Sequence, residues 1–245
     1  MGASGARPSA DSGSGGLVAS SPFRAIVFGA TGMIGQGVLN ECLRDPRVEE
    51  ILVVGRSACG VEHEKLREVL CSDFFDYRAI EERLAGYDAC FFCLGVSSAG
   101  MSEAEYRRLT YDLTMRAAET LVRVSPEMTF CYVSGAGTDG TEKGRSMWAR
   151  VKGKTENDLL ALPFAASFMF RPGYVQPGPG VRSKTALYRI AYGALGPLYP
   201  VWRRLLPGIV TTSANVGRAM IAVASGGYEK RILEVRDINA LAERA

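Results

Sequence analysis

The sequence predicts an α/β protein with a doubly wound, mostly parallel sheet and a small C-terminal helical cap. From Phe23 onward, short apolar runs alternate with longer amphipathic segments, which is typical of repeated βαβ units. A glycine-rich turn directly follows the first apolar run. Hydrophobic residues form 47% of the 245 residues, enough to bury a sizeable core. We expect one domain over residues 23–245 with a substrate-side cap at about 175–212, and a disordered segment at 1–22, where large apolar side chains are almost absent.

The first half of the chain opens with a strand, a turn and a helix. Residues 24–28 form an apolar strand, and the helix after the glycine turn carries apolar residues on one face from Ile34 to Cys42. This helix is expected to end near Asp45, because the proline that follows disfavours helical geometry in the residue before it. The further elements expected in this half are strands at 50–54, 70–72 and 89–94 and a helix at 77–85.

The second half begins with a capping box, since Ser102 can accept from a first-turn amide while Glu105 reaches back to the cap. The long helix that starts there keeps apolar residues at helical spacing until Ser125 and Pro126. The further elements expected here are strands at 129–133, 166–170 and 231–235, helices at 146–162 and 214–224, and cap helices at 183–194 and 198–205.

Composition argues against several classes of function. A net charge of +3 gives no reason to expect nucleic acid or an anionic membrane as the main partner. The six cysteines lie in apolar or helical segments and are expected to be reduced core residues, including the C-x-x-C pair Cys90 and Cys93, which a strand would point to opposite faces. His63 is the only histidine, so no metal site is expected.

The same composition predicts the cellular setting. No apolar run is long enough to span a bilayer, and we expect a cytoplasmic protein, with a homodimer left open. The cap alternates apolar with basic residues; we interpret its apolar face as closing a substrate pocket rather than as a membrane-surface helix.

The glycine turn predicts a bound dinucleotide. Gly29, Gly32 and Gly35 follow an apolar strand and open a helix, so they permit a tight turn and let the backbone approach a pyrophosphate. Thr31, Met33 and Ile34 fill the same turn and are expected to contact the cofactor.

The end of the second strand predicts which dinucleotide is bound. Arg56 stands about 20 residues beyond the turn, where a carboxylate would select NAD and an arginine would accommodate a 2′-phosphate. We therefore favour NADP(H) over NAD(H). Asp73 with Phe74 is expected to meet the adenine edge, and Gly95 would let the backbone pass close to the cofactor.

Together, the glycine turn at 29–35, Val54-Gly55-Arg56, Asp73-Phe74 and Arg171-Pro172-Gly173 resemble the short-chain dehydrogenase/reductase superfamily. More narrowly, the chain looks like the atypical branch near the NmrA-like, Tat-interacting-protein-like and NAD-dependent epimerase/dehydratase proteins. The likeness covers about residues 24–235. It implies a Rossmann fold that binds a dinucleotide at the carboxyl ends of its strands, with Pro172 and Gly173 beside the cofactor.

The same resemblance implies a catalytic set that is incomplete here. The superfamily carries a serine after strand five and Tyr-x-x-x-Lys on the next helix, in which tyrosine exchanges a proton and lysine lowers its pKa and holds the nicotinamide ribose. Lys152 is present, but Trp148 stands in the tyrosine position, and an indole N–H cannot shuttle a proton. Ser134 is the best match for the serine, with Gly135 and Ala136 in the neighbouring slots.

Other groups remain open as replacements. Thr138, Tyr174 or Tyr111 could supply a hydroxyl, and Asp112 could orient the lysine. Two functions follow: an NADP(H)-dependent oxidoreductase or epimerase/dehydratase acting on a small carbonyl or hydroxyl compound, or a non-catalytic NADP(H)-sensing regulator or scaffold.

Overall fold

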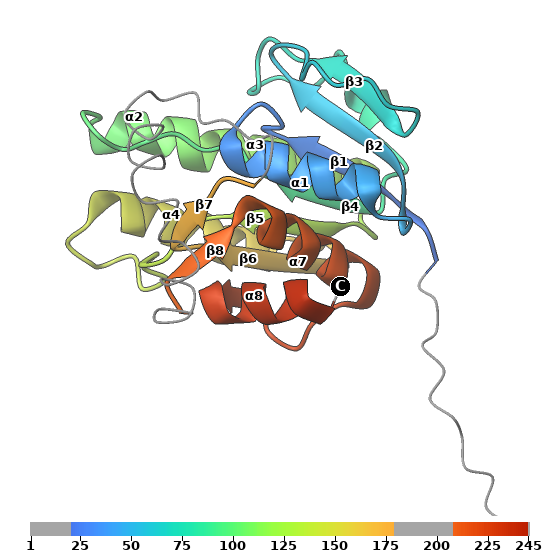
Figure 1. The fold of residues 1–245 in the computed structure, drawn as a ribbon. Helices are drawn as coiled ribbons and strands as arrows, with labels where there is room; N and C mark the ends of the chain where they lie inside the picture. Colours follow the sequence, from blue (N-terminus) through green and yellow to red (C-terminus); the bar gives the residue numbers. More distant parts are fainter. Residues whose placement is uncertain (1–20, 179–207, 245) are drawn as a thin grey trace, which may run out of the picture.

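The computed structural model describes residues 21–178 and 208–244, and its centre is a seven-stranded sheet (Figure 1). All strand pairings in this sheet are parallel, in the order β3-β2-β1-β4-β5-β6-β9. The predicted doubly wound α/β sheet is confirmed. The strands are β1 (Phe23–Phe28), β2 (Val48–Gly55), β3 (Leu66–Leu70), β4 (Ala89–Phe92), β5 (Thr129–Val133), β6 (Ala166–Arg171) and β9 (Ile232–Glu234).

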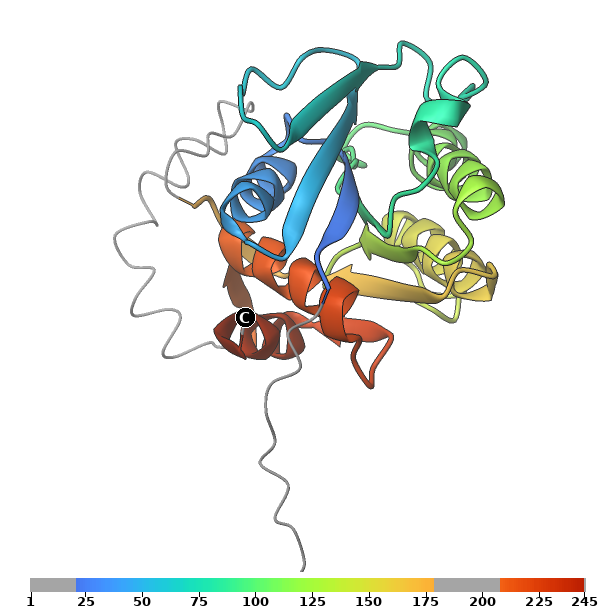
Figure 2. The same cartoon turned by 90° about the vertical axis from the view of Figure 1, so that its right-hand side faces the viewer.

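Helices cover both faces of the sheet, as Figures 1 and 2 show from two directions. One face carries α1 (Met33–Arg44), α7 (Ser213–Gly226) and α8 (Val235–Arg244); the other carries α3 (Leu113–Val124) and α4 (Met147–Ala161). Successive strand residues point to opposite faces. Val27 therefore joins the core under α1, while Ile26 joins the core under α3, and both are fully buried.

Several local elements differ from the sequence prediction. The third strand lies at 66–70 instead of 70–72, and the expected helix at 77–85 is reduced to one 3₁₀ turn, η1 (Glu81–Leu84). The long helix after Ser102 does start with the predicted capping box. It is divided, however, into α2 (Glu103–Arg107), a π-helical turn η2 (Arg108–Asp112) and α3.

Two features near the C-terminus were missed. Strands β7 (Tyr174–Gln176) and β8 (Val210–Thr212) pair in parallel as a separate two-stranded sheet at the edges of the expected cap. Helix α8 was not predicted, although Val235, Ile238 and Leu241 follow a helical spacing and are buried. The expected cap helices at 183–194 and 198–205 lie outside the described residues. Within the described ranges, no helix is long and apolar enough to cross a membrane.

Candidate functional site

A cleft of about 760 Å³ opens at the carboxyl ends of the central strands. It lies where the strand order reverses between β1 and β4, which is the usual ligand position in doubly wound folds. The residues that line it are Gly32, Met33 and Ile34 after β1, Cys93–Ser98 after β4, Tyr106 of α2, Val133 and Ser134 at the end of β5, Trp148 and Lys152 of α4, and Pro172–Val175 after β6.

Steric contacts require glycine at two positions of the turn after β1. Gly29 has a φ of +78°, and a Cβ there would lie 2.8 Å from the backbone carbonyl of Cys93. A Cβ on Gly35 would lie 2.1 Å from the carbonyl oxygen of Gly29. The absence of a Cβ at these two positions lets the start of α1 lie close to the ends of β1 and β4.

The amino end of α1 faces this cleft without a protein cap. Gly32 is the N-cap residue and has no side chain to cap the helix; no side chain among the described residues caps it, and the first turn contains no acidic residue. Met33 and Ile34 from this turn line the cleft, while the carbonyl of Thr31 accepts a hydrogen bond from Gln36 Nε2 at 3.0 Å. The positive end of the helix dipole and its amides are therefore available to an anion.

The ends of β2 and β3 lie beside the cleft rather than in its lining. Arg56 is exposed and makes no hydrogen bond or ion pair with the described part of the chain. Asp73 is also exposed, and its carboxylate accepts the Phe75 amide at 2.9 Å. The expected cofactor contact of Phe74 needs correction, because its ring is 7% exposed and packs in the core, 6.3 Å from the ring of Phe28.

Lys152 is the charged group of the cleft. It is half-buried on α4, and its Nζ donates to the backbone carbonyl of Ser134. Burial lowers the pKa of Lys152 to about 8, although the nearby negative charge of Glu156 opposes this shift.

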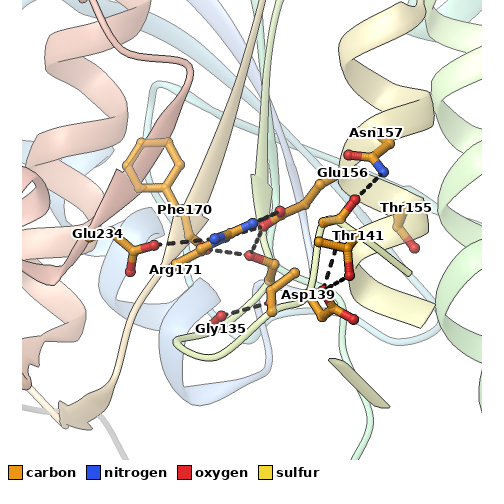
Figure 3. A network of polar contacts seen from close by, with 12 residues as sticks. Gly135, Asp139, Thr141, Thr155, Glu156, Asn157, Phe170, Arg171 and Glu234 are labelled. Atoms are coloured by element: carbon orange, nitrogen blue, oxygen red, sulfur yellow. Dashed lines mark hydrogen bonds and ion pairs between the residues drawn. The ribbon is translucent and has the colours of Figure 1, made fainter. Parts of the chain in front are cut away.

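The expected role of the Ser134 hydroxyl also needs correction. Its Oγ donates to Glu156 Oε1 at 2.5 Å and lies 3.1 Å from the carbonyl of Phe170. Glu156 is fully buried and forms a two-pronged ion pair with Arg171, whose other arm reaches Glu234 at 3.3 Å (Figure 3). The hydroxyl thus belongs to a buried polar network, and the serine presents its carbonyl to Lys152.

Trp148 lies one helical turn before Lys152 and lines the same cleft. Its indole lies near the loop after β5, where a Cβ added to Gly137 would come 3.5 Å from the ring atom Cη2.

The other candidate hydroxyls are dispersed. Tyr111 donates to Asp158 at 2.5 Å, and Thr138 donates to the carbonyl of Gly135 at 2.7 Å; neither lines the cleft. Tyr174 does line it, with its hydroxyl donating to Gln176 at 2.9 Å. Asp112, expected near Lys152, is exposed and contacts Arg107 at 3.9 Å.

Sequence reasoning missed Tyr106 as a lining residue. Its helical spacing marked it only as an apolar core position, and the ring is indeed only 2% exposed. Its place in the capping-box helix directly after β4 was the available signal.

The remaining predicted contacts fall into two kinds. Gly95 and Pro172 line the cleft, and a Cβ on Gly95 would meet no atom within 4 Å, so protein packing does not require glycine there. Gly173 also lines it, but a Cβ on Gly173 would lie 2.3 Å from the carbonyl of Ile209. Strand pairing between β7 and β8 therefore explains that glycine.

Comparison with known proteins gives relatives at low identity. No protein-family model matches the sequence. A mitochondrial FMP52-1 protein of Scheffersomyces stipitis is 26% identical over 225 residues, which cover 89% of this chain and 97% of the relative. The HTATIP2 protein of Rattus norvegicus is 26% identical over 150 residues, covering 61% and 60%.

The names of the relatives overturn one expectation. FMP52 proteins of Scheffersomyces stipitis, Emericella nidulans and Debaryomyces hansenii are mitochondrial. The expected cytoplasmic location is therefore wrong. The expectation was based on the net charge and on the lack of a long apolar run. These two features do not distinguish the cytoplasm from a mitochondrial compartment.

Solved structures share the fold. The enzyme WbmF of Bordetella bronchiseptica, in complex with NAD⁺, superposes with a TM-score of 0.61 at 14% identity and covers 91% of this chain and 78% of its own. A short-chain dehydrogenase family protein from Francisella tularensis gives 0.57 at 14% identity, covering 84% and 93%. The chain thus has the fold of the short-chain dehydrogenase/reductase superfamily, and the resemblance to its atypical branch that the sequence motifs indicated is confirmed.

Proposed function

We propose that this chain binds NADP(H) in the cleft and acts as an oxidoreductase or epimerase/dehydratase on a small carbonyl or hydroxyl compound. The observation that carries the proposal is the meeting of two groups in one cleft: the uncapped amino end of α1 and the ammonium group of Lys152. The first suits a pyrophosphate, and the second suits the hydroxyls of a nicotinamide ribose. WbmF, which shares the fold, is known in complex with NAD⁺.

Arg56 supports NADP(H) over NAD(H). It follows β2, the strand next to β1 and its glycine turn, and its guanidinium is not engaged by the described residues. A free guanidinium at this place can form bidentate bonds with a 2′-phosphate.

Catalysis would need a proton source other than position 148. The cofactor supplies hydride chemistry when bound, so the protein must orient the substrate and provide a proton. Lys152 lies in the cleft with a pKa lowered by burial to about 8, which suits proton transfer near neutral pH.

A second candidate function is a non-catalytic NADP(H) sensor or scaffold. Two features support it. Trp148 stands where the resemblance to the superfamily implies a tyrosine, and the Ser134 hydroxyl donates to the buried Glu156.

Purified protein would separate the two functions. NADPH affinity is measured by titration, and NADPH oxidation is followed with a panel of aldehydes and ketones, for wild type and Trp148→Tyr. Turnover by wild type supports the enzyme. Tight NADPH binding without turnover, unchanged in Trp148→Tyr, supports the sensor, and failure to bind either NADPH or NADH rejects both.

We also propose a mitochondrial location, on the strength of the FMP52 relatives. Cell fractionation of the full-length chain tests this directly, and recovery in the cytosol alone would contradict it.

A further inference from the structure

The cleft has a second half beyond the expected path of a dinucleotide. The turn after β1, Gly95 and Lys152 belong to the cofactor half under the proposed function. The other half is lined by Val96, Tyr106, Trp148, Tyr174 and Val175. Val96 is 40% exposed, and Trp148 and Tyr174 are half-buried, so these side chains offer surface to a ligand.

Charge restricts what this second half can bind. Among the described lining residues, Lys152 is the only one with a charged side chain, and it already donates to the Ser134 carbonyl. Neither an arginine nor a carboxylate joins it among the described residues of the lining. A ligand carboxylate or phosphate would lose its hydration here without gaining a counter-ion of its own from these residues.

The aromatic side chains indicate the shape of the ligand. The indole of Trp148 lies near the loop after β5, since a Cβ added to Gly137 would come 3.5 Å from its Cη2 atom. The hydroxyl of Tyr174 donates to Gln176 at 2.9 Å, which restrains the second ring. Half-buried aromatic rings have few rotatable bonds, so they can pack against a flat ligand at little cost in conformational entropy.

We propose that the second half of the cleft binds an uncharged aromatic carbonyl compound, with Trp148 as its main contact. Trp148 lies one helical turn from Lys152, so a ligand at Trp148 would lie next to the residue proposed to hold the nicotinamide ribose. This assignment of a substrate class rests on the proposed function.

Three probes of similar size test the assignment. Acetophenone is uncharged and aromatic, 4-acetylbenzoate adds a carboxylate, and cyclohexyl methyl ketone removes the aromatic ring. Binding of each to the full-length protein is measured by saturation-transfer NMR with and without NADPH, and NADPH affinity is measured separately. Acetophenone is expected to bind at least about tenfold more tightly than 4-acetylbenzoate and more tightly than the cyclohexyl ketone.

Substitutions identify the contact. Trp148→Leu is expected to weaken acetophenone binding by about two- to tenfold, with NADPH affinity measured separately for this variant. Phe75→Leu is the control, because Phe75 is a half-buried aromatic residue that lines a different surface depression. Circular dichroism of both variants verifies their folding. If Trp148→Leu disturbs the structure, Trp148→Phe, which keeps an aromatic ring, is measured instead and is expected to bind acetophenone.

The outcomes separate this inference from the proposed function. Equal or tighter binding of 4-acetylbenzoate overturns the assignment, as does acetophenone binding that Trp148→Leu leaves unchanged. If NADPH binds and none of the three probes does, the dinucleotide proposal stands and the substrate class is wrong. If NADPH fails to bind while acetophenone binds through Trp148, the aromatic site stands and the proposed function is wrong.

Discussion

Lys152 combines a lowered pKa with a place in the lining of the cleft, two properties that the sequence does not show together. Burial lowers its pKa to about 8, while its Nζ remains in the lining of the cleft. Glu156, the nearby carboxylate, is engaged by Arg171, so it only partly offsets the cost of burying the ammonium charge. A lysine of this kind changes its charge close to physiological pH.

NADPH affinity is therefore expected to fall as pH rises through about 8. Lys152 is charged below this pKa and neutral above it, and a charged donor forms the stronger hydrogen bonds with a ribose. The loss between pH 7 and 9.5 should be about five- to tenfold, measured by NADPH titration. Lys152→Met should bind weakly at every pH without this dependence.

Lys154→Met is the control for this pH dependence. Lys154 lies on the same helix but pairs with Asp158 at 2.9 Å, which raises the pKa of Lys154. Its removal should leave the pH dependence intact. A wild-type affinity that is constant from pH 7 to 9.5 would contradict the role of Lys152.

Single residues were predictable where spacing alone decides their place. Gly29 was predicted in the turn after the first strand, and Lys152 was predicted on the helix after the fifth strand. The structure places both residues there. Ser134 and Phe74 did not behave as expected, because the direction of a side chain depends on distant partners. The Ser134 hydroxyl is oriented by Glu156, 22 positions away in the chain.

At the scale of elements, the junction of β1 and α1 should not tolerate a methyl group at Gly35, whereas the loop after β4 should tolerate one at Gly95. In Gly35→Ala the added Cβ would meet the Gly29 carbonyl at 2.1 Å, a backbone atom that cannot move freely. The clash should outweigh the gain of about 1 kcal/mol in helix propensity and lower the free energy of unfolding by about 1–3 kcal/mol.

Gly95→Ala is the matched variant. Its Cβ would enter open space, so the free energy of unfolding should change by less than about 0.5 kcal/mol. NADPH affinity should nevertheless fall, because the methyl group would occupy the cofactor side of the cleft. Urea unfolding and NADPH titration of both variants check this, and equal stability losses would contradict the steric argument.

The ion pair between α4 and β6 should contribute to stability through burial rather than through charge alone. Glu156→Gln removes the buried partner of Arg171, whose side chain is only 14% exposed, and leaves this arginine with Glu234 alone, which is 54% exposed. The free energy of unfolding should fall by about 3 kcal/mol in urea denaturation. Glu234→Gln removes the exposed partner of the same arginine and should cost less than about 1 kcal/mol. Similar losses in both variants would contradict this.

Elements with a strong period were predictable, and elements set by local strain were not. The helix at 146–162 and the strand at 129–133 agree closely with α4 and β5. The π-helical turn η2 arises inside a continuous helical pattern, and no residue type there marks the extra residue per turn. Helix α8 was missed because it begins directly at the end of β9, without an intervening turn signal.

At the scale of the whole molecule, the sheet was predictable because alternating elements allow few topologies. Parallel crossovers take one hand, which restricts the possible strand orders, and the sheet has the order β3-β2-β1-β4-β5-β6-β9. The pairing of β7 with β8 brings together segments more than 30 residues apart and has no local signal. The cleft depends on both the sheet and this pairing, since segments that follow β1, β4, β5 and β6 line it and β7 lies at its edge.

A ligand that contacts both halves of the sheet should stabilise the molecule as a unit. NADPH at 100 times its Kd would add about 2.7 kcal/mol to the free energy of unfolding. For a chain of this size the melting temperature should rise by about 5–10 °C.

At the same concentration, 2′,5′-ADP, which can reach the end of β2 but not Lys152, should give a smaller rise, measured by calorimetry. In Arg56→Ala, the rise in melting temperature that NADPH produces should be no larger than the rise that NADH produces. If 2′,5′-ADP raised the melting temperature as much as NADPH, the contacts at Lys152 would add nothing, and the cleft would hold only the adenosine end of the cofactor.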